Sequence, residues 1–96
     1  MQVAPGVDIR RLKPDFLKRL DCVDKFYETH NEKLRVIPPY AGTPDDLAFY
    51  CTGDAADIDN PVEMSEKFAD EIRSCFSWDY DVVFELDRVV IMYRPM

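Results

Sequence analysis

The chain has 96 residues, enough for one domain with one modest core, and its 47% hydrophobic and 12% aromatic residues exclude disorder as the dominant state. Its net charge of -7, from 12 basic and 19 acidic residues, disfavours a nucleic-acid partner, because phosphate backbones repel an acidic protein. No apolar run approaches the roughly 20 residues of a membrane span, and the first six residues lack the basic and apolar regions of a signal peptide, so we expect no membrane contact and no signal peptide.

The first part of the chain predicts an N-terminal arm and a helix. Residues 1–13 show no regular period and include three basic residues, so we expect an arm that packs on the body or on a neighbouring chain. Pro14 suits a first helical turn, and apolar residues then recur at three- and four-residue spacing as far as Tyr27. This helix should end near His30, which we expect as an exposed residue that interacts with the helix dipole.

Two short strands separated by a loop are predicted next. Residues 34–37 alternate and are followed by two prolines, which indicates a strand that stops there. Residues 38–51 predict a loop with a turn at 42–46, where Gly, Pro and Asp cluster. Residues 55–58 predict another short strand.

The remainder predicts a helix and a hairpin. Residues 60–63 offer an N-cap, a proline at the first helical position and a capping-box acid, so a helix should begin there and close near Trp78. Residues 80–86 and 88–93 are rich in β-formers and predict a hairpin. The order of elements predicts an α+β domain in which two helices pack on a small, mainly antiparallel sheet.

The three cysteines, Cys22, Cys51 and Cys75, are odd in number, far apart in sequence and form no CxxC pair. This spacing argues against a zinc ribbon and against a disulfide scaffold. We expect reduced, mostly buried thiols, which are typical of a reducing compartment.

Three segments invite a functional interpretation. Residues 52–59 carry three aspartates that could bind a hard cation, but their spacing is not that of an EF-hand, and a solvated turn enclosing a strand is favoured. Glu85 and Asp87 could do acid–base work, although such a pair more often marks an exposed strand end. Residues 38–42 resemble a binding loop but carry no reactive group.

Together, these segments resemble the zinc-dependent cell-wall peptidases that include D-alanyl-D-alanine carboxypeptidases and phage endolysins. Residues 34–41 stand where that family has a strand and an arginine turn. Residues 48–57 resemble its Ser-x-His-x-x-Gly-x-Ala-x-Asp motif, and residues 85–90 resemble its Glu-x-Asp-His-x-His motif. The resemblance covers nearly the whole chain and implies a single peptidase-like domain over residues 1–96.

Most residues that would hold the family's metal are replaced. Its ligands are histidines and an aspartate. Tyr50 takes the place of the first histidine, and Arg88 and Val90 take the places of the closing pair. The aspartate survives as Asp57. Because catalytic zinc needs about three protein ligands, the resemblance implies a pseudoenzyme with no metal and no cofactor.

The other site positions also bear on this interpretation. The general base of the family survives as Glu85, but without zinc it has no water to activate. Ala41 replaces the arginine expected to hold a substrate carboxylate. Asp57, Glu85 and Arg88 converge in the family fold, so we expect Arg88 to bridge one or both carboxylates in place of the metal. Tyr50 should pack nearby.

Three functions are considered for a chain that has lost the catalytic residues of this family. The first is a structural or interaction protein, above all a phage virion component such as a capsid decoration or tail protein, whose partners are other virion proteins or further copies of itself. The alternatives are a non-hydrolytic peptidoglycan-binding module and a residual cell-wall peptidase with an unusual metal site. The expected location is the virion for a phage-encoded chain and the cytoplasm otherwise.

Overall fold

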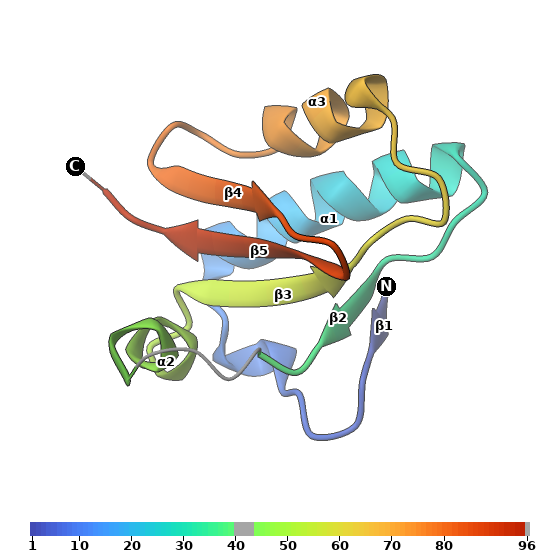
Figure 1. Cartoon of the computed structure of the whole chain (residues 1–96). Helices are drawn as coiled ribbons and strands as arrows, with labels where there is room; N and C mark the ends of the chain where they lie inside the picture. The colour runs from blue at the N-terminus through green and yellow to red at the C-terminus, as the bar shows by residue number, and fades with distance from the viewer. Residues whose placement is uncertain (40–43, 96) are drawn as a thin grey trace.

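The computed structural model describes residues 1–39 and 44–95, and of residues 44–46 the backbone alone. Ala41 and the predicted turn residues 42 and 43 lie outside the described residues. The elements in chain order are β1 (Gln2–Val3), a 3-10 turn (Ile9–Arg11), α1 (Pro14–Thr29), β2 (Arg35–Ile37), α2 (Pro44–Cys51), β3 (Ala55–Asp59), α3 (Glu66–Ser74), β4 (Tyr80–Phe84) and β5 (Arg88–Tyr93). They form an α+β domain with a five-stranded mixed sheet (Figure 1).

The sheet has the order β1-β2-β3-β5-β4, and only the β1–β2 pair among these neighbours is parallel. The predicted α+β class and mainly antiparallel sheet are therefore confirmed. Helix α1 begins at Pro14 as predicted, and the strands β2, β3 and the β4–β5 hairpin lie where the alternating patterns indicate. No helix in residues 1–39 and 44–95 is long and apolar enough to cross a membrane.

Helix α2 occupies residues 44–51, so the loop predicted for residues 38–51 is wrong over that part, and the helix is a third beside the two expected. Pro44 stands at its start, a position that proline suits because its missing N–H has no helical partner there. The helix is only 8 residues long, and the nearby glycine and prolines give the sequence the appearance of a loop.

Helix α3 begins at Glu66, so the start predicted at residues 60–63 is wrong. Ser65 is its N-cap, and the Ser65 hydroxyl accepts a hydrogen bond of 3.0 Å from the Phe68 amide. Asn60 instead donates its side-chain amide to two carbonyl oxygens of the β4–β5 turn, at 3.1 and 3.0 Å. The helix ends at Ser74, before the predicted limit near residue 78.

The N-terminal arm packs on its own chain. The Gln2 amide donates to the Leu34 carbonyl at 2.8 Å and the Ala4 amide donates to the Val36 carbonyl at 2.9 Å, which holds β1 beside β2. Ala4 and Leu12 are buried, and Val7 and Ile9 pack against the core. Most apolar side chains of the arm therefore pack on this chain, as one of the two alternatives predicted. A strand of 2 residues is too short for a periodic signal, so β1 could not be predicted.

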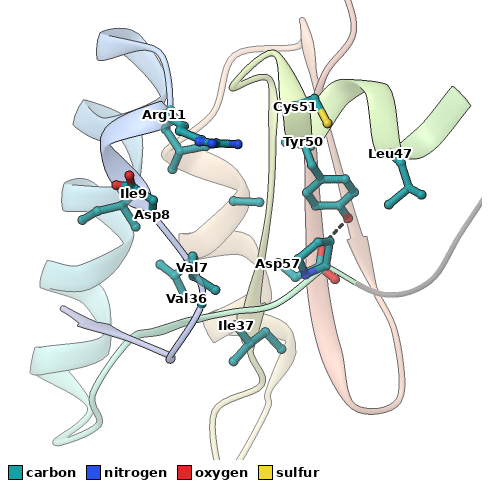
Figure 2. Close-up of a pocket in the computed structure, with 15 residues that line it drawn as sticks. Val7, Asp8, Ile9, Arg11, Val36, Ile37, Leu47, Tyr50, Cys51 and Asp57 are labelled. Atoms are coloured by element: carbon teal, nitrogen blue, oxygen red, sulfur yellow. Dashed lines mark hydrogen bonds between the residues drawn. The ribbon is translucent and has the colours of Figure 1, made fainter. Parts of the chain in front are cut away.

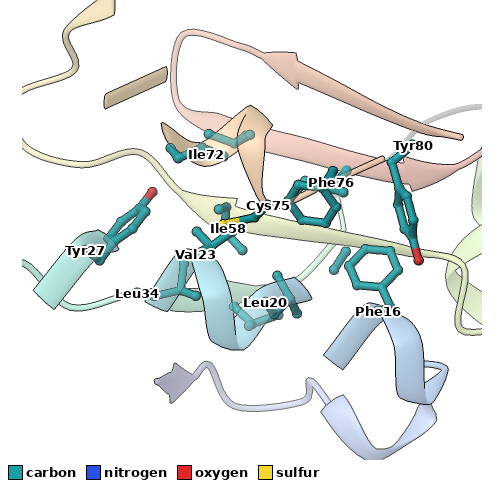
Figure 3. Close-up of a cluster of buried hydrophobic side chains, with 14 of the residues drawn as sticks. Phe16, Leu20, Val23, Tyr27, Leu34, Ile58, Ile72, Cys75, Phe76 and Tyr80 are labelled. Carbon is teal, nitrogen blue, oxygen red and sulfur yellow. The ribbon is translucent and has the colours of Figure 1, made fainter. Parts of the chain in front are cut away.

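Helices α1 and α3 cover one face of the sheet, and the hydrophobic core lies between them and the strands (Figures 1 and 3). Burying each large apolar side chain contributes about 1.5–3 kcal/mol. The core residues that the two helices contribute are Phe16, Leu20, Val23, Tyr27, Phe68 and Ile72. The central strands add Ala56, Ile58, Val89 and Ile91.

His30 joins the two helices and is not the exposed residue that was expected. Its ring stacks on Phe68 with a centroid distance of 4.0 Å. Its Nε2 atom lies 2.8 Å from Glu71 Oε1. The end of α1 is therefore anchored to α3 by a stacked ring and a polar contact.

A disulfide joins Cys22 of α1 to Cys75 at the end of α3, so the expectation of three reduced thiols is wrong. The Cα atoms of the two residues are 5.7 Å apart, within the usual range for a disulfide. Cys51 is free and exposed, not buried. The pairing depends on how α1 packs on α3, and sequence spacing carries no signal for it.

Stability should fall at high pH because two tyrosine hydroxyls are buried. The Tyr27 hydroxyl donates to the Asp59 carbonyl at 2.9 Å, and the Tyr80 hydroxyl donates to Asp15 Oδ2 at 2.7 Å. Burial raises the pKa of both tyrosines above their ordinary value of 10, and the nearby Asp15 carboxylate raises that of Tyr80 further. The unfolded chain therefore loses these protons first, so this stabilisation is full below about pH 10 and is lost as the pH rises further.

Urea unfolding followed from about pH 9 to about pH 12 should show this loss as a falling free energy of unfolding, by up to about 1.4 kcal/mol per pH unit for each tyrosine. The Tyr27→Phe/Tyr80→Phe double variant should give a flatter profile over the same range. An equally steep fall in that variant would assign the alkaline instability to other groups.

Candidate functional site

The positions that the peptidase resemblance assigns to metal ligands meet on the sheet face opposite α1 and α3. Asp57 on β3 is the Cα partner of Val90 on β5, so their side chains share one face of the sheet. Arg88 lies two residues before Val90 and shares that face. Helix α2 brings Tyr50 to the same place, where its hydroxyl contacts the Asp57 carboxylate (Figure 2).

Asp57 is the centre of this cluster, and its side chain is 0% exposed. Arg88 Nη1 donates to Asp57 Oδ2 at 2.8 Å, and the Tyr50 hydroxyl donates to Asp57 Oδ1. Arg88 also donates to the Pro38 carbonyl at 2.9 Å and lies 3.4 Å from Asp87 Oδ2. The hydrogen bond to Asp57 raises the pKa of Arg88 above its ordinary value. The expected contact between Arg88 and Asp57, with Tyr50 beside it, is present.

Glu85 stands apart from this cluster. It is exposed at the end of β4, and its backbone amide donates to the Arg88 carbonyl at 2.8 Å. Its carboxylate forms no ion pair in the part of the chain that the structure describes. Arg88 therefore bridges to Asp57 and Asp87 and not to Glu85. The general-base position and the ligand position Asp57 do not share a site in this chain.

The aspartates of residues 52–59 do not converge on a shared cation. Each has its own basic partner, and the pairs are Lys13–Asp54 at 2.8 Å, Arg88–Asp57 at 2.8 Å and Arg35–Asp59 at 3.6 Å. Asp57 is buried, which differs from the solvated turn that was favoured. Among the described side chains, those of residues 1–39 and 47–95, no group of three or more His, Cys, Asp or Glu is placed to hold a metal ion.

A pocket of about 250 Å³ opens beside the cluster, between the N-terminal arm and α2 (Figure 2). Tyr50 and Asp57 form its polar end. Its apolar walls come from Val7, Ile9, Leu12, Val36, Ile37, Leu47, Ala55 and Ala56. The sequence does not reveal this pocket, because one wall was predicted as an irregular arm and the other as a loop.

Gly53 lets the arm approach the connection between α2 and β3. Its φ of +80° is a conformation that residues with a side chain rarely adopt, and a Cβ there would lie 2.1 Å from the Arg11 carbonyl oxygen. The Lys13 amide donates to the Gly53 carbonyl at 3.2 Å. The arm is thereby docked against the α2–β3 connection, which fixes the width of the pocket.

The chemistry of the cluster is that of a satisfied ion pair. A guanidinium has only donors and cannot ligate a metal, and the Tyr50 hydroxyl donates a hydrogen bond to the Asp57 carboxylate. Both Asp57 oxygens therefore already accept hydrogen bonds inside the fold. No family model matches this chain, and neither a curated protein nor a solved structure matches it.

Proposed function

We propose that this chain is a catalytically inactive, peptidase-like domain that acts as a structural or interaction protein. In its most specific form the proposal is a phage virion component, such as a capsid decoration or tail protein. The supporting observation is that Tyr50, Asp57 and Arg88 meet at one place and carry an ion pair where the active relatives would carry zinc. The net charge of -7 suits an outer surface better than one that faces packaged DNA.

Arg88 takes the place of a metal ion as the positive charge beside Asp57. A buried carboxylate needs a cation or a proton, and zinc supplies that cation in the active relatives. Arg88 supplies it here and forms a hydrogen bond to Asp57 at 2.8 Å. This exchange preserves the fold around Asp57 and removes the open coordination position that hydrolysis requires.

The pocket beside Tyr50 favours a second candidate, the non-hydrolytic peptidoglycan-binding module. It has an apolar wall and a polar end, which is the general form of a small-ligand site.

Cosedimentation of the purified chain with phage particles, but not with isolated cell-wall sacculi, would support the virion component. Cosedimentation with sacculi alone would support the binding module.

Restoring the ligands tests the peptidase-like site itself. The wild-type chain should hold far less than one zinc per chain after dialysis, whereas Tyr50→His/Arg88→His should retain about one zinc per chain, because it presents two imidazoles beside Asp57. The control Tyr50→Phe/Arg88→Leu offers no added ligand and should stay empty. Elemental analysis measures all three proteins. Stoichiometric zinc in the wild type would contradict the proposal, and a folded double-histidine variant without zinc would contradict the resemblance.

A further inference from the structure

The two carboxylates that line the pocket beside α2 both have ion-pair partners. Asp8 is held by Arg10 through contacts of 2.9 and 3.0 Å, and Asp57 is held by Arg88. Figure 2 shows the Asp8 carboxylate on the side of the arm away from Tyr50. Neither carboxylate therefore presents an uncompensated negative charge to a ligand.

Arg11 is a second cation of the pocket near Asp8: the hydrogen bonds from Arg10 lower the pKa of Asp8 most, and the charge of Arg11 adds to that effect. Arg11 is exposed, lies at the end of the 3-10 turn, and forms no ion pair with any residue in the described parts of the chain. Figure 2 shows its guanidinium extending across the mouth of the pocket toward Tyr50 and Cys51. In a protein of net charge -7, the mouth of this apolar pocket is thus locally positive.

We propose that this pocket binds a small apolar monocarboxylate, with its hydrocarbon part between the arm and α2 and its carboxylate on Arg11. Guanidinium pairs with carboxylate through parallel hydrogen bonds, and the apolar walls favour a hydrocarbon chain or ring. A cavity of about 150 Å³ holds benzene, so the 250 Å³ here accommodates up to about ten heavy atoms of a ligand whose carboxylate lies at the mouth. This inference stands independently of the proposed structural role.

The free acid and the C-terminal residue of a peptide present the same chemistry. Hexanoate represents the first source and N-acetyl-leucine the second. Hexanol and hexylamine keep the hydrocarbon chain and replace the carboxylate by a neutral or cationic group. Chemical-shift titration of the labelled chain gives a dissociation constant for each, and the rate at which iodoacetamide alkylates Cys51, the free thiol that lines the pocket, reports occupancy.

We expect hexanoate or N-acetyl-leucine to shift the amide resonances of Val7, Leu47 and Ala55 and to slow the alkylation of Cys51. Hexanol should bind more weakly by up to about fivefold, the ratio that an exposed ion pair contributes, and hexylamine more weakly still. Whichever carboxylate binds more tightly identifies the source.

Arg11→Gln should abolish the preference for carboxylate over alcohol, and Arg11→Lys should keep it. Lys25→Gln makes the same change in net charge at an exposed site on α1 and should leave the preference unchanged. Equal binding of hexanoate and hexylamine, saturating shifts outside the pocket, or a preference that survives Arg11→Gln would overturn the proposal. Absence of binding by both carboxylates would overturn it as well.

Discussion

Replacing Arg88 with alanine should lower the free energy of unfolding by about 3 kcal/mol, because it leaves a buried carboxylate without its cation. The Asp57 side chain is 0% exposed and that of Arg88 is 17% exposed, so water gains little access to the charge. The Tyr50 hydroxyl would remain as a hydrogen-bond donor to Asp57, but it carries no compensating charge. Urea unfolding of the two proteins at neutral pH measures the difference.

The double-mutant cycle separates the ion pair from lost packing. Adding Asp57→Asn to Arg88→Ala should recover part of the loss, because the stranded charge is gone. Arg35→Ala is the matched control, since Arg35 and Asp59 are 44% and 41% exposed and such pairs contribute about 1 kcal/mol or less. Additive effects of Asp57→Asn and Arg88→Ala would reject the bridge, and so would equal losses for Arg35→Ala and Arg88→Ala.

Removing the Cys22–Cys75 disulfide should lower the free energy of unfolding by about 4 kcal/mol, because the bond closes a long loop in the unfolded chain. The two cysteines are 53 residues apart in sequence, and the loss of loop entropy grows with the logarithm of that length. Urea unfolding of Cys22→Ala/Cys75→Ala beside the wild type measures the effect. Cys75 is buried, so the loss of its packing contacts should lower the free energy of unfolding further.

Reductant provides the control for this disulfide. It should shift the unfolding midpoint of the wild type and of Cys51→Ala, and leave that of Cys22→Ala/Cys75→Ala unchanged. Thiol titration of the unfolded wild type should find one reactive group before reduction and all three cysteines after it. Three thiols before reduction would show that the bond does not form.

Long periodic segments were predictable and short ones were not. Helix α1 carries an apolar stripe over 16 residues, and the β4–β5 hairpin carries two alternating runs, so local pattern and tertiary structure agree there. Strand β1 and helix α2 have 2 and 8 residues, and packing against the body of the domain outweighs their weak local signals. Asn60 shows the opposite error, because its side chain satisfies a distant turn and not the helix that follows.

Part of the candidate site could likewise be predicted before the structure, and part of it could not. The contact between Asp57 and Arg88 could be expected only from the resemblance to the peptidase family, and the register of β3 and β5 accounts for it by placing the two residues on one face of the sheet, in diagonal positions. The pocket could not be expected, since its walls are an arm and a short helix brought together by the glycine at residue 53. The partner of Cys22 likewise depends on helix packing that spacing does not encode.

The position of β5 in the sheet also determines which steps of folding can take place before this strand is available. This strand is synthesised after the other four, yet it lies inside the sheet, between β3 and β4 (Figure 1). A nascent chain that ends before β5 can form the pairing of β2 with β3 but cannot bury the carboxylate of β3 at position 57, because the guanidinium that neutralises it has not been made. Insertion of the last strand therefore closes the sheet and compensates the charge in one step, which makes the domain fold as a unit only when its C-terminal strand is available.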